Sequence, residues 1–156
     1  MVRYLTFCYT QSMKPAQRPI GIELSLVAGH ASRAFDEALA AAGGSRPTWL
    51  ILMNLKQQPT ANQRELAGKV GIRGATLTHH LNGMEAAGLL NRRRDPDNRR
   101  VHIVELSEAG HAMFFQLLGT VVEFDKRLCR GFEAPELELF RGLLGRIQAN
   151  LLEDPA

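Results

Sequence analysis

Apolar residues recur at intervals of three and four along most of the chain, which is the spacing of helices that bury one face. The first stripe predicts a helix over about 19–42, which the pair Gly43-Gly44 ends. Two more stripes in the last third of the chain predict helices over about 107–131 and 135–152. A serine opens the first of these and a proline the second, and both residue types favour helix starts.

The middle of the chain predicts three shorter helices. Pro47 opens one that continues over 48–57, and the next covers about 62–70. A tight turn at Gly71 leads into a helix over about 73–87. Two helices joined by a short turn that contains glycine form the helix-turn-helix arrangement.

A strand and a turn follow these helices. The β-branched run at 101–106 predicts a strand, and the turn formers Asp-Pro-Asp-Asn occupy 95–98 just before it. The simplest structure is a two-stranded hairpin with an arginine-bearing tip, packed on the helices because an isolated hairpin is marginal in water. We therefore expect a mainly α fold with a small β-hairpin wing, that is, a winged helix-turn-helix with additional long helices.

The three long helices carry more apolar surface than the small domain formed by the short helices and the hairpin, here called the reader domain, can cover. We expect them to meet the same helices of a second copy in a two-fold dimer. The expected organisation is an irregular leader at 1–18, a helical dimerisation domain at 19–45 and 107–156, and a winged helix-turn-helix DNA-binding domain at 46–106.

The composition is that of one ordinary core, with 156 residues, 45% of them hydrophobic and 22% charged. No apolar run approaches the ~20 residues that a membrane span needs. The two cysteines, Cys8 and Cys129, fit a reducing cytoplasm rather than a disulfide framework. No glycine-rich phosphate loop and no metal-ligand cluster occurs in the sequence, so we expect no cofactor.

The positive charge is concentrated in one segment. The whole chain has a formal net charge of +3, and residues 91–100 alone hold five arginines against two aspartates. A solvated loop is one explanation of a charge run, but lysine would serve solubility equally well. Arginine offers a planar fork of donors that suits phosphate and guanine edges. The segment therefore favours a nucleic-acid-binding arm, with Arg94, Arg99 and Arg100 among its contacts.

The helix over 73–87 has the features of a recognition helix. On a wheel of ~100° per residue, Leu77, Leu81 and Met84 share the core face. The outer face carries small or hydrogen-bonding side chains, and the only acid, Glu85, lies near the C-terminal end. Such a face suits a major groove, because phosphates repel acids. The candidate DNA contacts on this helix are Arg73, Thr76, Thr78, His79 and Asn82, with Arg73 and the first free amides holding phosphate.

The adjacent histidines have simpler explanations. His79 could equally be an ordinary surface residue, and we expect His80 to be a partly buried packing residue. Neighbouring side chains on a helix point ~100° apart, so the pair is a poor metal chelate and no metal site is expected. No nucleophile–base pair occurs at a readable spacing, so an enzyme is not expected.

Five stretches occur in an order that resembles one protein family. They are Gln63–Ile72, Thr76–Thr78, Met84–Leu90, Arg93–Val101 and Leu106–Gly110. Together they resemble the MarR (multiple antibiotic resistance regulator) family over roughly residues 20–152. The resemblance is most specific at the wing, where Asp97-x-Arg99 matches the family's Asp-x-Arg signature.

The resemblance implies a cytoplasmic, homodimeric bacterial transcription factor on a pseudo-palindromic operator, and we expect a ligand-responsive repressor. It implies that residues 76–83 read the major groove and that Arg99 enters the minor groove, braced by Asp97. A narrow minor groove attracts an inserted arginine because its negative potential is concentrated. The family often has arginine where His79 stands, so its base preference does not transfer to this chain.

The resemblance also implies regulation by small, often phenolic ligands held between the dimerisation helices and the reader domain. The candidate ligand-binding residues are His30, Trp49, Met53 and Phe114, and an equal alternative is that all four are core residues. Redox sensing through Cys8 or Cys129 and a winged-helix module that binds protein instead of DNA are further alternatives.

Overall fold

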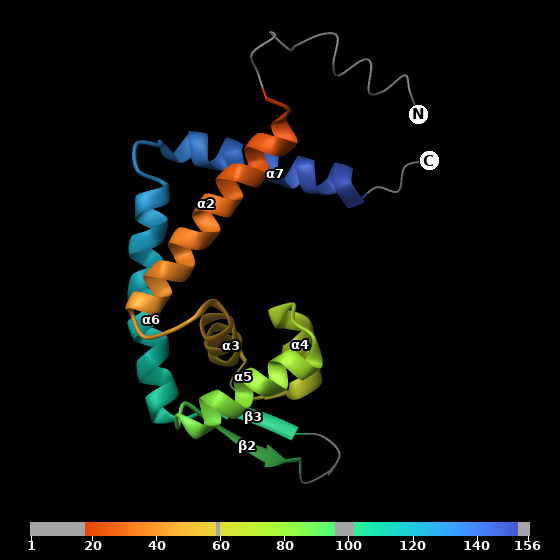
Figure 1. The fold of residues 1–156 in the computed structure, drawn as a ribbon, viewed down its shortest axis with the longest axis vertical. Helices are drawn as coiled ribbons and strands as arrows, with labels where there is room; N and C mark the ends of the chain where they lie inside the picture. The colour runs from red at the N-terminus through yellow and green to blue at the C-terminus, as the bar shows by residue number, and fades with distance from the viewer. Residues whose placement is uncertain (1–17, 59, 96–101, 153–156) are drawn as a thin grey trace. The chain divides into compact units, whose positions relative to one another are not determined.

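The computed structural model of the chain describes residues 18–58, 60–95 and 102–152 (Figure 1). The chain divides into two units, one ending at Glu37 and the other beginning at Ala38. Helix α2 (Ile20–Ala41) crosses that boundary, and every later element lies in the second unit. Within the described residues, no helix combines the length and the apolar character that crossing a membrane would need.

Serine caps begin two helices of the second unit. Helix α3 (Arg46–Gln57) follows Ser45, whose hydroxyl accepts a hydrogen bond from a first-turn amide at 3.3 Å. Helix α6 (Glu108–Leu128) follows Ser107, whose hydroxyl accepts from the amide of Gly110 at 3.0 Å. The prediction that Ser107 is an N-cap is therefore confirmed, because the side chain satisfies one of the orphan donors of the first turn.

The two helices of the helix-turn-helix are α4 (Gln63–Val70) and α5 (Gly74–Ala86). Asn62 caps the first of them, with its side-chain oxygen accepting from an amide of the first turn at 2.8 Å. Gly71 ends α4 with φ 74°, a left-handed conformation that favours glycine. The observed bounds lie within one or two residues of those predicted from the sequence.

The described sheet contains the two predicted hairpin strands and one further strand. Strand β3 (His102–Leu106) lies between β2 (Leu90–Arg94) and β1 (Thr60–Asn62), and both pairings are antiparallel. The predicted hairpin is therefore confirmed as β2–β3, and the unpredicted β1 joins its edge through pairs such as Thr60↔Glu105. Three residues between two helices carry no alternation of their own, so only the distant partner identifies them as a strand.

Most of the buried apolar residues lie between residues 49 and 104, and Leu39, Phe114 and Leu117 add to them from α2 and α6. Figure 1 shows α3, α4, α5 and the β2–β3 hairpin gathered in one cluster, and these elements contact one another. The predicted core face of α5 is confirmed, since Leu77, Leu81 and Met84 are buried. The other side chains that this cluster buries completely or almost so are Ile51, Leu52, Leu55, Leu66, Leu90 and Val104.

Many large apolar side chains of α2, α6 and α7 are exposed in the single chain. Helix α7 (Ala134–Leu152) buries no residue, although it carries six exposed leucines and phenylalanines. Those six are Leu139, Phe140, Leu143, Leu144, Leu151 and Leu152. The first half of α2 likewise exposes Ile20, Ile22, Leu26 and Val27. Clustered apolar surface of this kind marks an interaction surface, because isolated soluble chains rarely expose it.

Candidate DNA-binding surface

The solvent-facing side of α5 carries short polar side chains. Thr76, His79 and Asn82 are exposed, whereas Thr78 and His80 are half-buried. The rings of the two histidines make an edge-on contact, with centroids 5.8 Å apart and planes at 64° to each other. From Gly74 to Met84 the helix carries no acid. A duplex could therefore approach this side of α5 without meeting a carboxylate.

The start of α5 leaves backbone donors without partners inside the helix. Arg73 occupies the N-cap position, is exposed, and makes no side-chain cap. The carbonyl of Arg73 accepts the first intrahelical bond, from the amide of Leu77 at 2.9 Å. The amides before Leu77 have no partner one turn back, so they can bind an anion at this end of the helix.

One side-chain hydrogen bond connects the starts of α4 and α5. The amide nitrogen Nε2 of Gln63 donates to the hydroxyl of Thr78 at 2.6 Å. That hydroxyl in turn donates to the carbonyl of Gly74 at 3.0 Å. The sequence analysis missed this connection, because a hydrogen bond between residues fifteen positions apart leaves no local signal.

An ion pair connects the end of α5 to the wing. Arg92 on β2 donates two hydrogen bonds to the carboxylate of Glu85, one of them from Nε at 2.9 Å. The side-chain hydrogen bond from Arg92 lowers the pKa of Glu85 below its usual value, and this effect outweighs the opposing effect of desolvation. The single acid of α5 is therefore paired within the protein.

The arginines of β2 point alternately to the two faces of the sheet. Arg92 pairs with Val104 in register and lies on the face that covers α5, whereas Arg93 lies on the other face. Arg93 reaches Glu105 of β3, with its terminal nitrogen 2.8 Å from the carboxylate. Arg94 is exposed and has no acidic partner among the described residues. Two of the arginines in segment 91–100 are thus engaged by acids of the protein itself.

The tip of the wing lies outside the described residues. Three predicted contacts fall there, namely Asp97, Arg99 and Arg100. The structure places the other candidates at the N-cap of α5, on α5 or on the strand that leads into the tip: Arg73, Thr76, Thr78, His79, Asn82 and Arg94. A groove of about 720 Å³ adjoins the start of α5, with Arg64 and His102 on its wall and no acid lining it.

The candidate effector residues have different surroundings. Trp49 and Phe114 are buried and stack on each other, with ring centroids 5.5 Å apart and planes 10° apart. Met53 is half-buried on the same helix as Trp49. His30 is exposed and belongs to the first unit.

Of the two cysteines, Cys129 is free and half-buried, and Cys8 lies outside the described residues.

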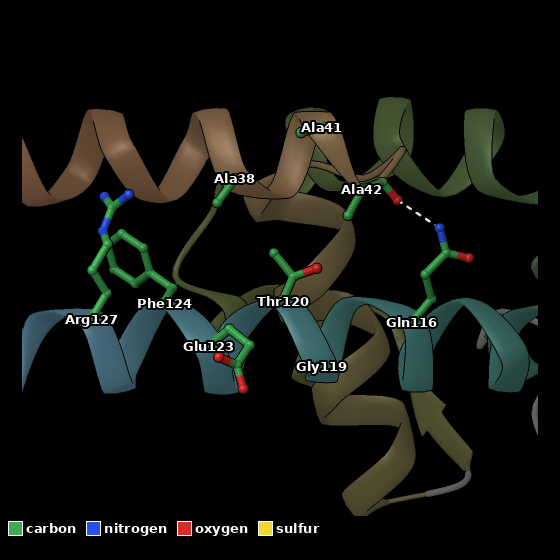
Figure 2. A pocket seen from close by; sticks show the side chains of 9 residues that line it. All are labelled: Ala38, Ala41, Ala42, Gln116, Gly119, Thr120, Glu123, Phe124 and Arg127. Carbon is green, nitrogen blue, oxygen red and sulfur yellow. Dashed lines mark hydrogen bonds between the residues drawn. The ribbon is translucent and has the colours of Figure 1, made fainter.

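A second groove, of about 630 Å³, lies between the last turns of α2 and the middle of α6 (Figure 2). Three alanines line it on the α2 side, and Thr120 and Phe124 point towards them from α6 in Figure 2. Gln116 closes one end by donating from Nε2 to the carbonyl of Ala42 at 2.9 Å. Arg127 lies over the ring of Phe124 at 5.3 Å. None of the four candidate effector residues lines this groove.

Metal binding finds no support in the described part of the chain, where no three His, Cys, Asp or Glu side chains are grouped suitably for an ion.

Solved structures share this fold along most of their length. The transcriptional repressor CouR, bound to a 23-mer DNA duplex, superposes with a TM-score of 0.77 at 23% identity, covering 88% of this chain and 99% of that one. A MarR-family regulator from Rhodococcus sp. RHA1 gives 0.72 at 24% identity, covering 88% and 96%. A mutant MarR from E. coli, complexed with operator DNA, gives 0.74 at 21% identity, covering 83% and 93%.

The sequence itself matches the family model described as "MarR family" over residues 45–102. That range covers α3, the two helices of the helix-turn-helix and the wing up to the start of β3. All of the candidate DNA-contact residues, from Arg73 to Arg100, lie within this range. Residues 45–102 thus match the MarR family model, and the chain shares the winged-helix fold of these solved regulators.

Proposed function

We propose that this protein is a repressor that binds a pseudo-palindromic DNA operator as a homodimer. Helix α5 would enter the major groove through Thr76, His79 and Asn82, and the wing would reach the adjacent minor groove through Arg99, braced by Asp97. Arg73, Arg94 and Arg100 would bind backbone phosphates. The observation that carries this proposal is that the outer side of α5 presents no acid. The one acid of the helix, Glu85, is paired with Arg92.

The exposed apolar faces of α2 and α7 support the dimer. Helix α7 has no buried residue in the single chain, and its apolar side chains recur at helical spacing. A second copy would cover them, which agrees with a dimerisation domain formed by 19–45 and 107–156 around a reader domain at 46–106. Two-fold symmetry would then present two α5 helices to half-sites one turn of DNA apart, ~34 Å. A protein that reads DNA in a bacterium acts in the cytoplasm.

We also propose that a small-molecule effector binds the protein, and the packing of the candidate residues restricts where it could fit. A small aromatic or phenolic ligand near His30, Trp49, Met53 and Phe114 would need to separate or flank the stacked Trp49–Phe114 pair. Any such ligand would act by preferring a dimer whose two α5 helices are badly spaced for DNA. Calorimetric titration of phenolic carboxylates into the protein, with and without operator, measures that preference directly.

Affinity selection of random duplexes, followed by sequencing, tests operator binding. We expect one enriched pseudo-palindrome. Arg99→Ala should weaken binding to it by ~1–3 kcal/mol while the dimer persists in sedimentation. Arg130→Ala is the matched control, since Arg130 is exposed in the turn beyond α6 and should leave affinity unchanged. Unchanged affinity in Arg99→Ala, or no enriched sequence, would favour a winged-helix module that binds protein.

A further inference from the structure

The hydrogen bonds of Thr78 join the first residues of both helices of the helix-turn-helix. Gln63, the first residue of α4, donates to the Thr78 hydroxyl, and the hydroxyl donates to Gly74, the first residue of α5. Both bonds are short enough to be well formed, at 2.6 and 3.0 Å. The three groups thus form one continuous chain from α4 to the first turn of α5.

Apolar packing does not hold that first turn. Gly74, Ala75 and Thr76 are exposed, and a Cβ added at Gly74 would meet no atom within 4 Å. The first buried side chain of α5 is Leu77, one turn into the helix. Among the described residues, the bond from Gln63 is the side-chain hydrogen bond that ties this turn to another element. The direction of the first turn therefore depends on the polar chain through Thr78.

The same geometry limits what Thr78 can offer to a base. A hydroxyl has one hydrogen, and the Thr78 hydrogen is directed to the carbonyl of Gly74. Thr78 is also half-buried, unlike Thr76, His79 and Asn82. The helical wheel placed Thr78 on the outer face with those residues, but its side chain is occupied by contacts within the protein.

We propose that Thr78 and Gln63 are positioning residues of the DNA-binding surface. They hold the first turn of α5 against α4 and so set the angle at which Arg73, Thr76 and His79 meet DNA, while neither reads a base. This inference rests on the proposed function, because it concerns how α5 docks on the operator. It revises the expectation that Thr78 is itself a base contact.

The test compares variants on a set of duplexes that carry every single-base change in the selected half-site. Thr78→Val removes both bonds with little change of shape, Thr78→Ser keeps them, and Gln63→Ala removes the bond to α4 alone. Thr76→Val is the matched control, an exposed threonine two residues earlier whose hydroxyl makes no hydrogen bond to a described residue. Thermal unfolding of each variant without DNA reports its fold separately.

Losing one net hydrogen bond is worth about three- to tenfold in operator affinity. We expect that loss for both Thr78→Val and Gln63→Ala, with weakened discrimination at several base pairs together and normal affinity in Thr78→Ser. The double variant should be no weaker than the weaker single variant, because one chain of bonds is broken in both. Thr76→Val should instead lose discrimination at a single base pair.

The inference is overturned if Thr78→Val loses discrimination at one base pair only, or if Gln63→Ala binds every duplex as the wild type does. Additive losses in the double variant would equally overturn it. If Thr78→Val fails to fold, the base preference of Gln63→Ala decides alone, since Gln63 begins a helix and its removal leaves the core intact. A wild-type protein that selects no operator refutes the proposed function instead, which keeps the two failures distinct.

Discussion

Replacing Gly110 by alanine should destabilise the junction between the wing and α6. Gly110 is buried in the first turn of α6, and a Cβ there would lie 1.9 Å from the carbonyl oxygen of Leu89. Since real Cβ atoms do not approach closer than 3.0 Å, the two groups must separate by about 1 Å. The same Cβ would also press on the backbone carbon of Leu89, at 3.0 Å.

The backbone of Leu89 cannot move without breaking hydrogen bonds. Its amide donates to the carbonyl of Met84 at 2.9 Å, and its carbonyl accepts from the amide of Ser107 at 3.1 Å. The Ser107 hydroxyl also donates to the carbonyl of Gly88 beside it. Moving Leu89 therefore strains the end of α5, the start of β2 and the cap of α6 together.

Overpacking of this kind costs about 2–4 kcal/mol of unfolding free energy, because backbone rather than a flexible side chain must shift. For a chain of this size the melting temperature should fall by roughly 6–12 °C. The measurement is urea and thermal unfolding at one fixed protein concentration, since the stability of the proposed dimer would depend on concentration.

Gly68→Ala is the matched control. Gly68 is an exposed glycine within α4, and a Cβ there would meet no atom within 4 Å. Alanine should be neutral or stabilising by about 0.5–1 kcal/mol, because it raises helix propensity. If Gly110→Ala unfolds within about 0.5 kcal/mol of the wild type, the close approach of α6 to Leu89 is wrong.

Three further predictions concern the Glu85–Arg92 ion pair, the exposed Arg94 and the apolar face of α7. Glu85→Gln should lower the stability of the fold at neutral pH, and the difference from the wild type should vanish on acidification. A group whose pKa is lowered by folding stabilises the folded state above its ordinary pKa of 4.5, and this stabilisation is lost as the pH falls through the lowered pKa. Equal deficits at pH 7 and pH 3 in thermal unfolding would contradict the Arg92–Glu85 pair. Arg94→Ala should weaken operator binding at low salt and reduce the slope of log affinity against log salt by about 1, and an unchanged slope would mean that Arg94 contacts no phosphate. Phe140→Glu or Leu143→Glu should convert the dimer to monomer in sedimentation, because either places a charge in the apolar face of α7, and a persistent dimer would locate the interface elsewhere.

The helices could be predicted from the sequence because their signals are local. The apolar period, a capping residue and a terminal glycine all lie within a few positions of the element that they define. Ser107 and Gly71 are examples, and both act in the structure as their residue types suggest. The core face of α5 follows from the same geometry, because Leu77, Leu81 and Met84 share a face in any straight helix.

Strand β1 could not be predicted in this way. Its three residues become a strand only because β3, more than forty residues later, offers an unpaired edge. The ion-pair partners of the arginines also depend on residues distant in the sequence. A count of charges cannot predict that Arg92 pairs with Glu85 and Arg93 with Glu105. Arg94 is exposed like Arg93, but it has no acidic partner among the described residues.

By itself, the amino-acid sequence determined the order of helices, the polar outer face of α5 and the arginine-rich wing, because each depends on neighbours along the chain. Tertiary structure alone decided which of those side chains are hydrogen-bonded or ion-paired within the protein. Thr78 illustrates the difference: its position on the helical wheel suits a base contact, but Gln63 on another helix occupies its hydroxyl. Periodicity specifies the direction in which a side chain points, whereas its hydrogen-bond partners depend on what folding brings alongside it.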